Sequence, residues 1–145
     1  VLNFTGNLLN GQISNITPKG DLTLIGTSLV CNGETGLMVY FGSRTGNALA
    51  EGRYTVKVTS NGKTRTGACR IVDNLCIVSV TGILASEIDD TFTFTVTDTK
   101  NSSNTFTFNY SPLDYLAAAQ SSSNEALINL ARAMYLYNQA ANNAL

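Results

Sequence analysis

The closest group of acidic side chains is the first place to look for chemistry. Glu87, Asp89 and Asp90 fall within one short segment, 82–90. Carboxylate oxygens are the ligands that Ca²⁺ prefers, but a calcium site gathers about 6–8 oxygens, commonly spaced along a loop that contains glycine. The group therefore has two interpretations, a weak calcium site and a solvated acidic corner, and the spacing favours the corner.

Catalysis needs combinations of reactive residues that this sequence does not offer. The chain has no histidine, so the commonest general base is missing from any nucleophilic triad. A glycosidase holds two carboxylates on opposite sides of a cleft. Glu87, Asp89 and Asp90 instead share one segment, which would present their charges to the same side. We expect that the chain is not an enzyme, has no catalytic residues and carries no cofactor.

Three cysteines, Cys31, Cys69 and Cys76, are the next reactive groups. They lack the C-x-x-C spacing of a zinc site. If a turn at 73–74 pairs the flanking strands, Cys69 and Cys76 are diagonal neighbours, roughly 7–8 Å apart. That is a poor geometry for a disulfide, and we expect the thiols to serve as small buried apolar side chains. One bridge with one leftover thiol remains the alternative.

Aromatic side chains are the remaining candidates for ligand binding. Polysaccharide sites commonly use aromatic platforms, and the chain has no tryptophan. Tyr40, Tyr135 and Tyr137 are therefore the candidate ligand-binding residues. Each lies in a pattern that packing explains equally well.

Length and charge restrict the class of protein. At 145 residues the chain has the size of one domain. Its net charge is -1 and only 13% of its residues are charged, so we expect no binding to nucleic acid or to a membrane. Abundant Thr, Ser, Asn and Gly are typical of secreted or surface β modules. We find no signal peptide, and because the chain begins at Val1 we expect a module excised from a longer protein.

Most of the chain has the alternating pattern of β-strands. The stronger strand-like segments are 21–31, 37–41, 53–60, 63–72, 75–81, 91–97 and 105–110, with weaker ones at 1–4 and 12–16. Asn61-Gly62 and Asp73-Asn74 predict tight hairpin turns. The aromatic strands 91–97 and 105–110 should pair around a polar tip, 98–104, and supply much of the core.

The last thirty-five residues have helical periodicity instead. Ser111, Pro112 and Asp114 match an N-cap, a first-turn proline and a capping box. Ser122 and Glu125 repeat the box for a second helix, which should extend over about 124–142. The apolar positions expected to be buried in this second helix are Leu127, Leu130, Ala131, Met134 and Tyr137.

Three segments carry a resemblance to a known family: GILASEIDDTFTFTVTDT, FTFNYSPLDYLAAAQ and NEALINLARAMYLYNQAA. Together with the hairpin 22–41, they resemble a module that recurs in large surface and cellulosome-associated proteins of gut Clostridia and ruminococci. Tyr110, Ser111, Asp114 and Tyr115 match the start of its first helix. The closing helix is matched by Leu127, Leu130, Ala133, Met134, Tyr137, Ala140 and Ala141. The sequence departs from the pattern at Asn138, where the family usually has glycine. The resemblance extends from about residue 20 onward and implies no catalytic role.

Together these features predict a mainly β (α+β) protein. We expect an immunoglobulin-like antiparallel β-sandwich, 1–110, with two short helices packed on it as a helical hairpin, 111–145, forming one module, 1–145. The expected function is that of a non-catalytic extracellular or cell-surface accessory module, a spacer or protein-interaction unit whose partners are neighbouring modules of the same parent protein. The alternative is a carbohydrate-binding module for plant polysaccharides, and a surface protein is a further possible partner.

Overall fold

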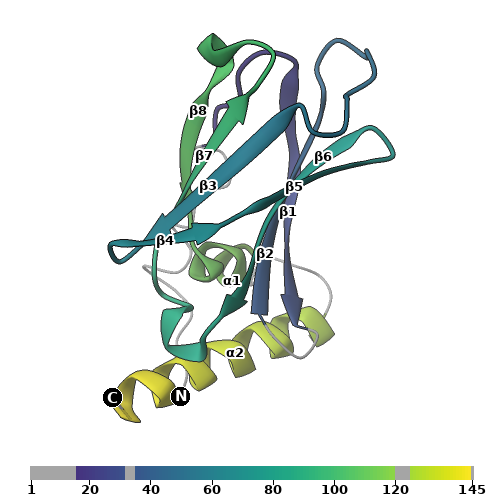
Figure 1. Ribbon diagram of the computed structural model, residues 1–145. Helices are drawn as coiled ribbons and strands as arrows, with labels where there is room; N and C mark the ends of the chain where they lie inside the picture. The colour runs from purple at the N-terminus through teal and green to yellow at the C-terminus, as the bar shows by residue number, and fades with distance from the viewer. Residues whose placement is uncertain (1–15, 32–34, 120–124, 145) are drawn as a thin grey trace.

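Within the described residues, the β-strands form two four-stranded antiparallel sheets (Figure 1). The computed structural model describes residues 16–31, 35–119 and 125–144. The first sheet has the order β1-β2-β6-β5, with β1 Leu22–Cys31, β2 Thr35–Ser43, β6 Leu75–Ile83 and β5 Ala68–Val72. The second has the order β4-β3-β7-β8, with β4 Lys63–Thr66, β3 Tyr54–Ser60, β7 Phe92–Asp98 and β8 Phe106–Tyr110. The predicted mainly β fold is confirmed, whereas the immunoglobulin-like arrangement stays a prediction.

Aromatic side chains fill the space between the sheets. Phe94 lies opposite Phe108 in the β7–β8 ladder, and their rings stack at 4.9 Å between centroids. Phe41 of the other sheet meets Phe106 edge-on at 5.6 Å. All four side chains are buried. The prediction that the two aromatic strands pair and supply the core is confirmed, because their period-2 pattern places every second ring on the inner face.

The two tight turns form where the sequence predicts them. Asn61 and Gly62 have φ values of 48° and 74°, and Asp73 and Asn74 have 52° and 59°. Two successive residues in the left-handed region are what a type I′ hairpin requires. Each turn therefore sets the register of the ladder that it closes, β3 with β4 and β5 with β6.

The segment 63–72 differs from its prediction as one continuous strand. It divides at Gly67, so that β4 belongs to one sheet and β5 to the other. A Cβ atom on Gly67 would lie 2.6 Å from Cγ1 of Val56 and 2.9 Å from Cγ2 of Val58. Only glycine lets the backbone pass this close to β3 while it crosses between the sheets.

The first helix starts as predicted. In α1 (Pro112–Ala119) the Ser111 hydroxyl accepts a hydrogen bond from the Leu113 N–H at 3.2 Å. The Ser111 N–H donates to Asp114 Oδ2 at 2.9 Å, which completes the capping box. The matching box that begins at Ser122 lies outside the described residues, as do the weak strands predicted at 1–4 and, apart from Ile16, at 12–16.

The second helix, α2 (Glu125–Ala144), has twenty residues and is longer than predicted. It crosses one end of the sandwich (Figure 1) and contacts α1 and the short 3₁₀ helix η3 (Ala85–Glu87). A further 3₁₀ helix, η4 (Ser102–Asn104), lies between β7 and β8. Ala131 and Met134 are buried there against Ile88 and Leu116.

The predicted burial of Leu130 and Tyr137 is wrong, since they are 47% and 65% exposed. The helix packs on a narrow support, α1 and η3, rather than on the face of a sheet. Within the described residues, no helix is long and apolar enough to cross a membrane.

Candidate functional site

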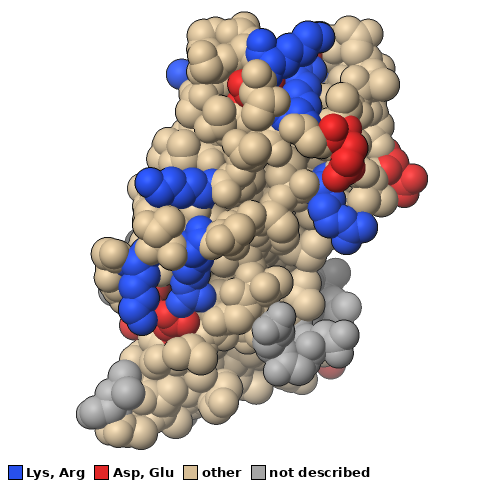
Figure 2. All heavy atoms as spheres, in the orientation of Figure 1, with Lys and Arg blue, Asp and Glu red and all other residues tan. Residues whose placement is uncertain are grey.

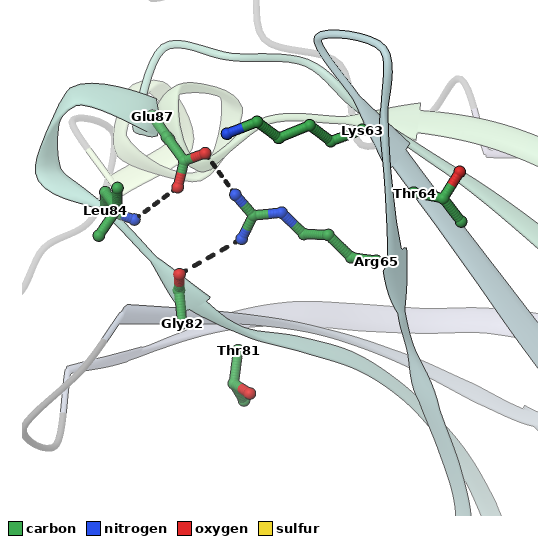
Figure 3. A pocket seen from close by; sticks show the side chains of 7 residues that line it. All are labelled: Lys63, Thr64, Arg65, Thr81, Gly82, Leu84 and Glu87. Carbon is green, nitrogen blue, oxygen red and sulfur yellow. Dashed lines mark hydrogen bonds and ion pairs between the residues drawn. The ribbon is translucent and has the colours of Figure 1, made fainter.

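An open pocket of about 670 Å³ lies where the edge strand β4 faces the end of β6 and η3 (Figure 3). Its lining residues are Lys63, Thr64, Arg65, Thr81, Gly82, Leu84 and Glu87. The pairing register of β4 with β3 explains why the side chains of Lys63 and Arg65 face this pocket. Arg65 pairs with Val58 and Lys63 pairs with Ser60, and both partners are buried, so the two cations lie on the inner side of β4.

An ion pair between Arg65 and Glu87 forms the wall of this pocket (Figure 3). Arg65 also donates to the Gly82 carbonyl at 3.3 Å, and its guanidinium lies 5.3 Å from the centroid of the Phe92 ring. The second carboxylate oxygen of Glu87 accepts from the Leu84 N–H at 2.8 Å. Burial raises the pKa of Glu87, but the Leu84 N–H and Arg65 outweigh it and hold that pKa below its ordinary value.

Lys63 is the exposed cation at the mouth of the pocket. Its ammonium points toward Glu87 in Figure 3, and a cluster of Lys and Arg side chains lies over this part of the molecule in Figure 2. The pocket thus offers a positive charge, and the one carboxylate that lines it is already hydrogen-bonded. Such an arrangement can attract a polar or anionic group, but it does not set two carboxylates across a cleft.

A second charged cluster lies at the other end of β3 and β7, where Tyr54 pairs with Asp98. Arg53 lies between two carboxylates, 3.0 Å from Asp21 and 3.0 Å from Asp98. Asp98 is 1% exposed and accepts further hydrogen bonds from the Lys100 N–H and the Asn104 amide. The hydrogen bond from Arg53 is the main reason that the pKa of Asp98 falls to about 2. Sequence reasoning placed Asp98 in a polar tip and missed this pair, because Arg53 is 45 positions away.

The three carboxylates considered for calcium are bound to three different sets of partners. Glu87 pairs with Arg65, whereas Asp89 accepts from the Asn138 amide at 3.3 Å and the Asn142 amide at 3.4 Å. Asp90 accepts from the Asn61 amide at 2.9 Å. Across residues 16–31, 35–119 and 125–144, no three His, Cys, Asp or Glu residues come together as a possible metal site.

The three candidate tyrosines lie on two separate elements. Tyr40 is on the outer face of β2, where its hydroxyl is 2.9 Å from the Ser28 hydroxyl and donates to the Met38 sulfur at 3.6 Å. Tyr135 is half-buried against the cluster under α2. Tyr137 is on the same helix but exposes most of its surface. Of the three, Tyr137 has the most exposed ring.

Asn138 has a structural role that sequence reasoning missed. It is fully buried, and its amide donates to the Ala85 carbonyl at 2.7 Å. This hydrogen bond fastens α2 to η3. A polar residue at a buried helical position was the available signal, since Asn138 falls one helical turn after Met134 on the buried stripe.

Comparison with known proteins gives no match, whether with a protein-family model, with a curated protein or with a solved structure.

Proposed function

We propose that this chain is a non-catalytic accessory module, a spacer or protein-interaction unit of a multimodular bacterial surface or cellulosomal protein. The observation that carries the proposal is that acidic side chains throughout the fold have structural partners. They accept hydrogen bonds from backbone N–H groups or from asparagine amides, or pair with arginine, and they are Asp21, Glu51, Glu87, Asp89, Asp90, Asp98 and Asp114. Carboxylates that are engaged in such contacts stabilise the fold and are not positioned to act as a general acid or base on a substrate.

The surface that best fits a protein contact is the outward side of α2. Leu130 and Tyr137 are exposed there and lie one above the other at a spacing of seven residues, which is two helical turns. Tyrosine is enriched at protein interfaces, and apolar side chains surrounded by a polar rim are typical of the centre of an interface. The Asn138 anchor fixes the helix beneath this surface. The partner that we propose is a neighbouring module of the same parent protein.

The test compares this chain alone with a two-module protein that includes the adjoining module of the parent. We expect the amides of α2 to exchange more slowly in the two-module protein, and Leu130→Glu with Tyr137→Ser to abolish the difference. Arg132→Glu is the matched control, because Arg132 is exposed on the opposite side of the same helix. Equal exchange in both proteins, with independent tumbling of the two modules, would contradict a contact through α2.

Carbohydrate binding is the alternative function, and the exposed ring of Tyr137 favours it. A glycan array and affinity electrophoresis against plant polysaccharides test it directly. Binding that is lost in Tyr137→Ala would support a platform on α2, whereas loss in Tyr40→Ala would move the platform to β2. Absence of retardation by every polysaccharide would exclude this alternative.

A further inference from the structure

Two thiols meet inside the β5–β6 hairpin. The register pairs Cys69 with Val78 and Ile71 with Cys76, so the two cysteines are diagonal neighbours on the inner side of the sheet. Their sulfur atoms are nevertheless only 3.1 Å apart. The prediction that the diagonal register keeps them apart is wrong, because both side chains turn toward each other. This distance between the two sulfur atoms is roughly 1 Å longer than a disulfide bond, which measures about 2.05 Å.

The two thiols differ in access to solvent. Cys76 is completely buried within the aromatic and aliphatic core, whereas Cys69 is half-buried on β5, an edge strand of its sheet. An oxidant can therefore reach Cys69 from outside, and Cys76 lies directly behind it. This is the arrangement of an attacking thiol with a second thiol positioned to resolve the mixed disulfide.

We propose that Cys69 and Cys76 form a reversible intramolecular disulfide, which makes the β5–β6 hairpin a redox modification site. The inference is independent of the proposed function, since it rests on the geometry and the solvent access of the two thiols.

The pKa shifts of the two thiols also favour Cys69 as the attacking thiol. A hydrogen bond with the Cys76 thiol lowers the pKa of Cys69, the accessible member. The same hydrogen bond and burial raise the pKa of Cys76. Cys69 is thus the thiol that ionises first and attacks, because the thiolate is the nucleophile in disulfide exchange.

The co-reactant is a small-molecule disulfide such as oxidised glutathione. The Cys69 thiolate attacks one sulfur of this disulfide, forms a mixed disulfide and releases one thiolate. Cys76 then gives up its proton and attacks Sγ of Cys69, expelling the second thiolate. In total the protein loses two S–H bonds and gains one S–S bond, while two electrons and two protons convert the small disulfide into two thiols.

The disulfide would hold an edge strand of the first sheet to its neighbour. Among the described residues, β5 pairs with β6 alone, and it continues from β4 through the crossing at Gly67. A covalent link from Cys69 to Cys76 holds β5 on β6 when the ladder hydrogen bonds open. We expect the oxidised protein to unfold at a higher temperature than the reduced protein.

Peptide mapping of the full chain after equilibration in glutathione buffers provides a direct test. Samples are blocked with N-ethylmaleimide and digested with trypsin, which cuts after Arg70, between the two cysteines. The expected product is peptide 66–70 joined to peptide 71–100, two hydrogen atoms lighter than the sum of the reduced peptides. The third thiol, Cys31, lies on peptide 20–44, so a bridge to it has a different mass.

Cys31→Ser and the double variant Cys31→Ser with Cys76→Ser are the matched controls. The first should still lose both reactive thiols on oxidation, and the second should stop at a mixed disulfide on Cys69 that reduction removes. If maleimide still blocks both Cys69 and Cys76 in the most oxidising buffer, the proposal is overturned. Linked peptides that arise only between two chains, seen as a dimer, would overturn it equally. If Cys31→Ser does not fold, the peptide map of the natural chain decides alone.

Discussion

At the scale of single residues, the charged side chains act in pairs that the fold buries to different depths. Arg53 bridges a carboxylate that is 1% exposed, Asp98, and one that is 36% exposed, Asp21. Breaking a buried pair leaves an uncompensated charge, whereas an exposed pair contributes little because water and salt screen it. The two aspartates therefore form a natural comparison around one guanidinium.

We predict that Asp98→Asn lowers the free energy of unfolding by about 2–4 kcal/mol at pH 7, and Asp21→Asn by about 1 kcal/mol or less. The pKa of Asp98 falls from 3.8 to about 2 on folding. Because the folded value is the lower one, the stabilisation is fully present above pH 4 or so and is lost as the pH falls toward 2. Urea titrations of both variants and the natural chain across this pH range measure the differences in the free energy of unfolding. If Asp98→Asn and the natural chain still differ by the same free energy of unfolding at pH 2, the ion-pair explanation is contradicted.

At the scale of elements, strands and turns are largely predictable because their signals are local. The Asn61-Gly62 turn, the Ser111 cap and the alternating aromatic strands all form as expected from short segments. The crossing at Gly67 was not predictable in the same way. The constraint there comes from Val56 and Val58, which reach Gly67 only after β3 has folded beside it.

We predict that Gly67→Ala destabilises the protein by about 1–3 kcal/mol, the usual cost of overpacking. The added methyl would collide with Cγ1 of Val56 at 2.6 Å. Gly26→Ala is the control, since its added Cβ meets no heavy atom within 4 Å. Thermal unfolding of the two variants compares the costs. Adding Val56→Ala to Gly67→Ala should cost less than the sum of the two single changes, and strict additivity would show that the collision is not the cause.

At the scale of the whole molecule, the sequence predicted which elements exist better than how they pack together. The helical stripe of α2 pointed to Leu130 and Tyr137 as buried, yet the helix crosses the end of the sandwich and buries Ala131, Met134 and Asn138 instead. The decisive contact is between Asn138 and Ala85, 53 positions apart. Periodicity shows that a helix has an apolar side, but it does not specify which support that side meets. For the same reason the pocket pair, Arg65 with Glu87, could not be read from spacing alone.

The position of α2 leads to a prediction about cooperativity. Asn138→Ala removes the 2.7 Å hydrogen bond to the Ala85 carbonyl, which keeps a longer one from the Ile88 N–H at 3.4 Å, and it also removes the hydrogen bond to Asp89. Together these losses should cost about 1–3 kcal/mol. Since α2 contacts mainly α1 and η3, the loss should loosen the helix more than the sheets. Hydrogen exchange should therefore accelerate in α2 and η3 while β7 and β8 keep their protection. Asn129→Ala makes the same chemical change at an exposed position of the same helix, so it serves as the control and should change neither. Equal acceleration in β7 and β8 would instead mean that the helix and the sandwich open as one cooperative unit, in which case α2 is part of the core rather than a separately anchored surface.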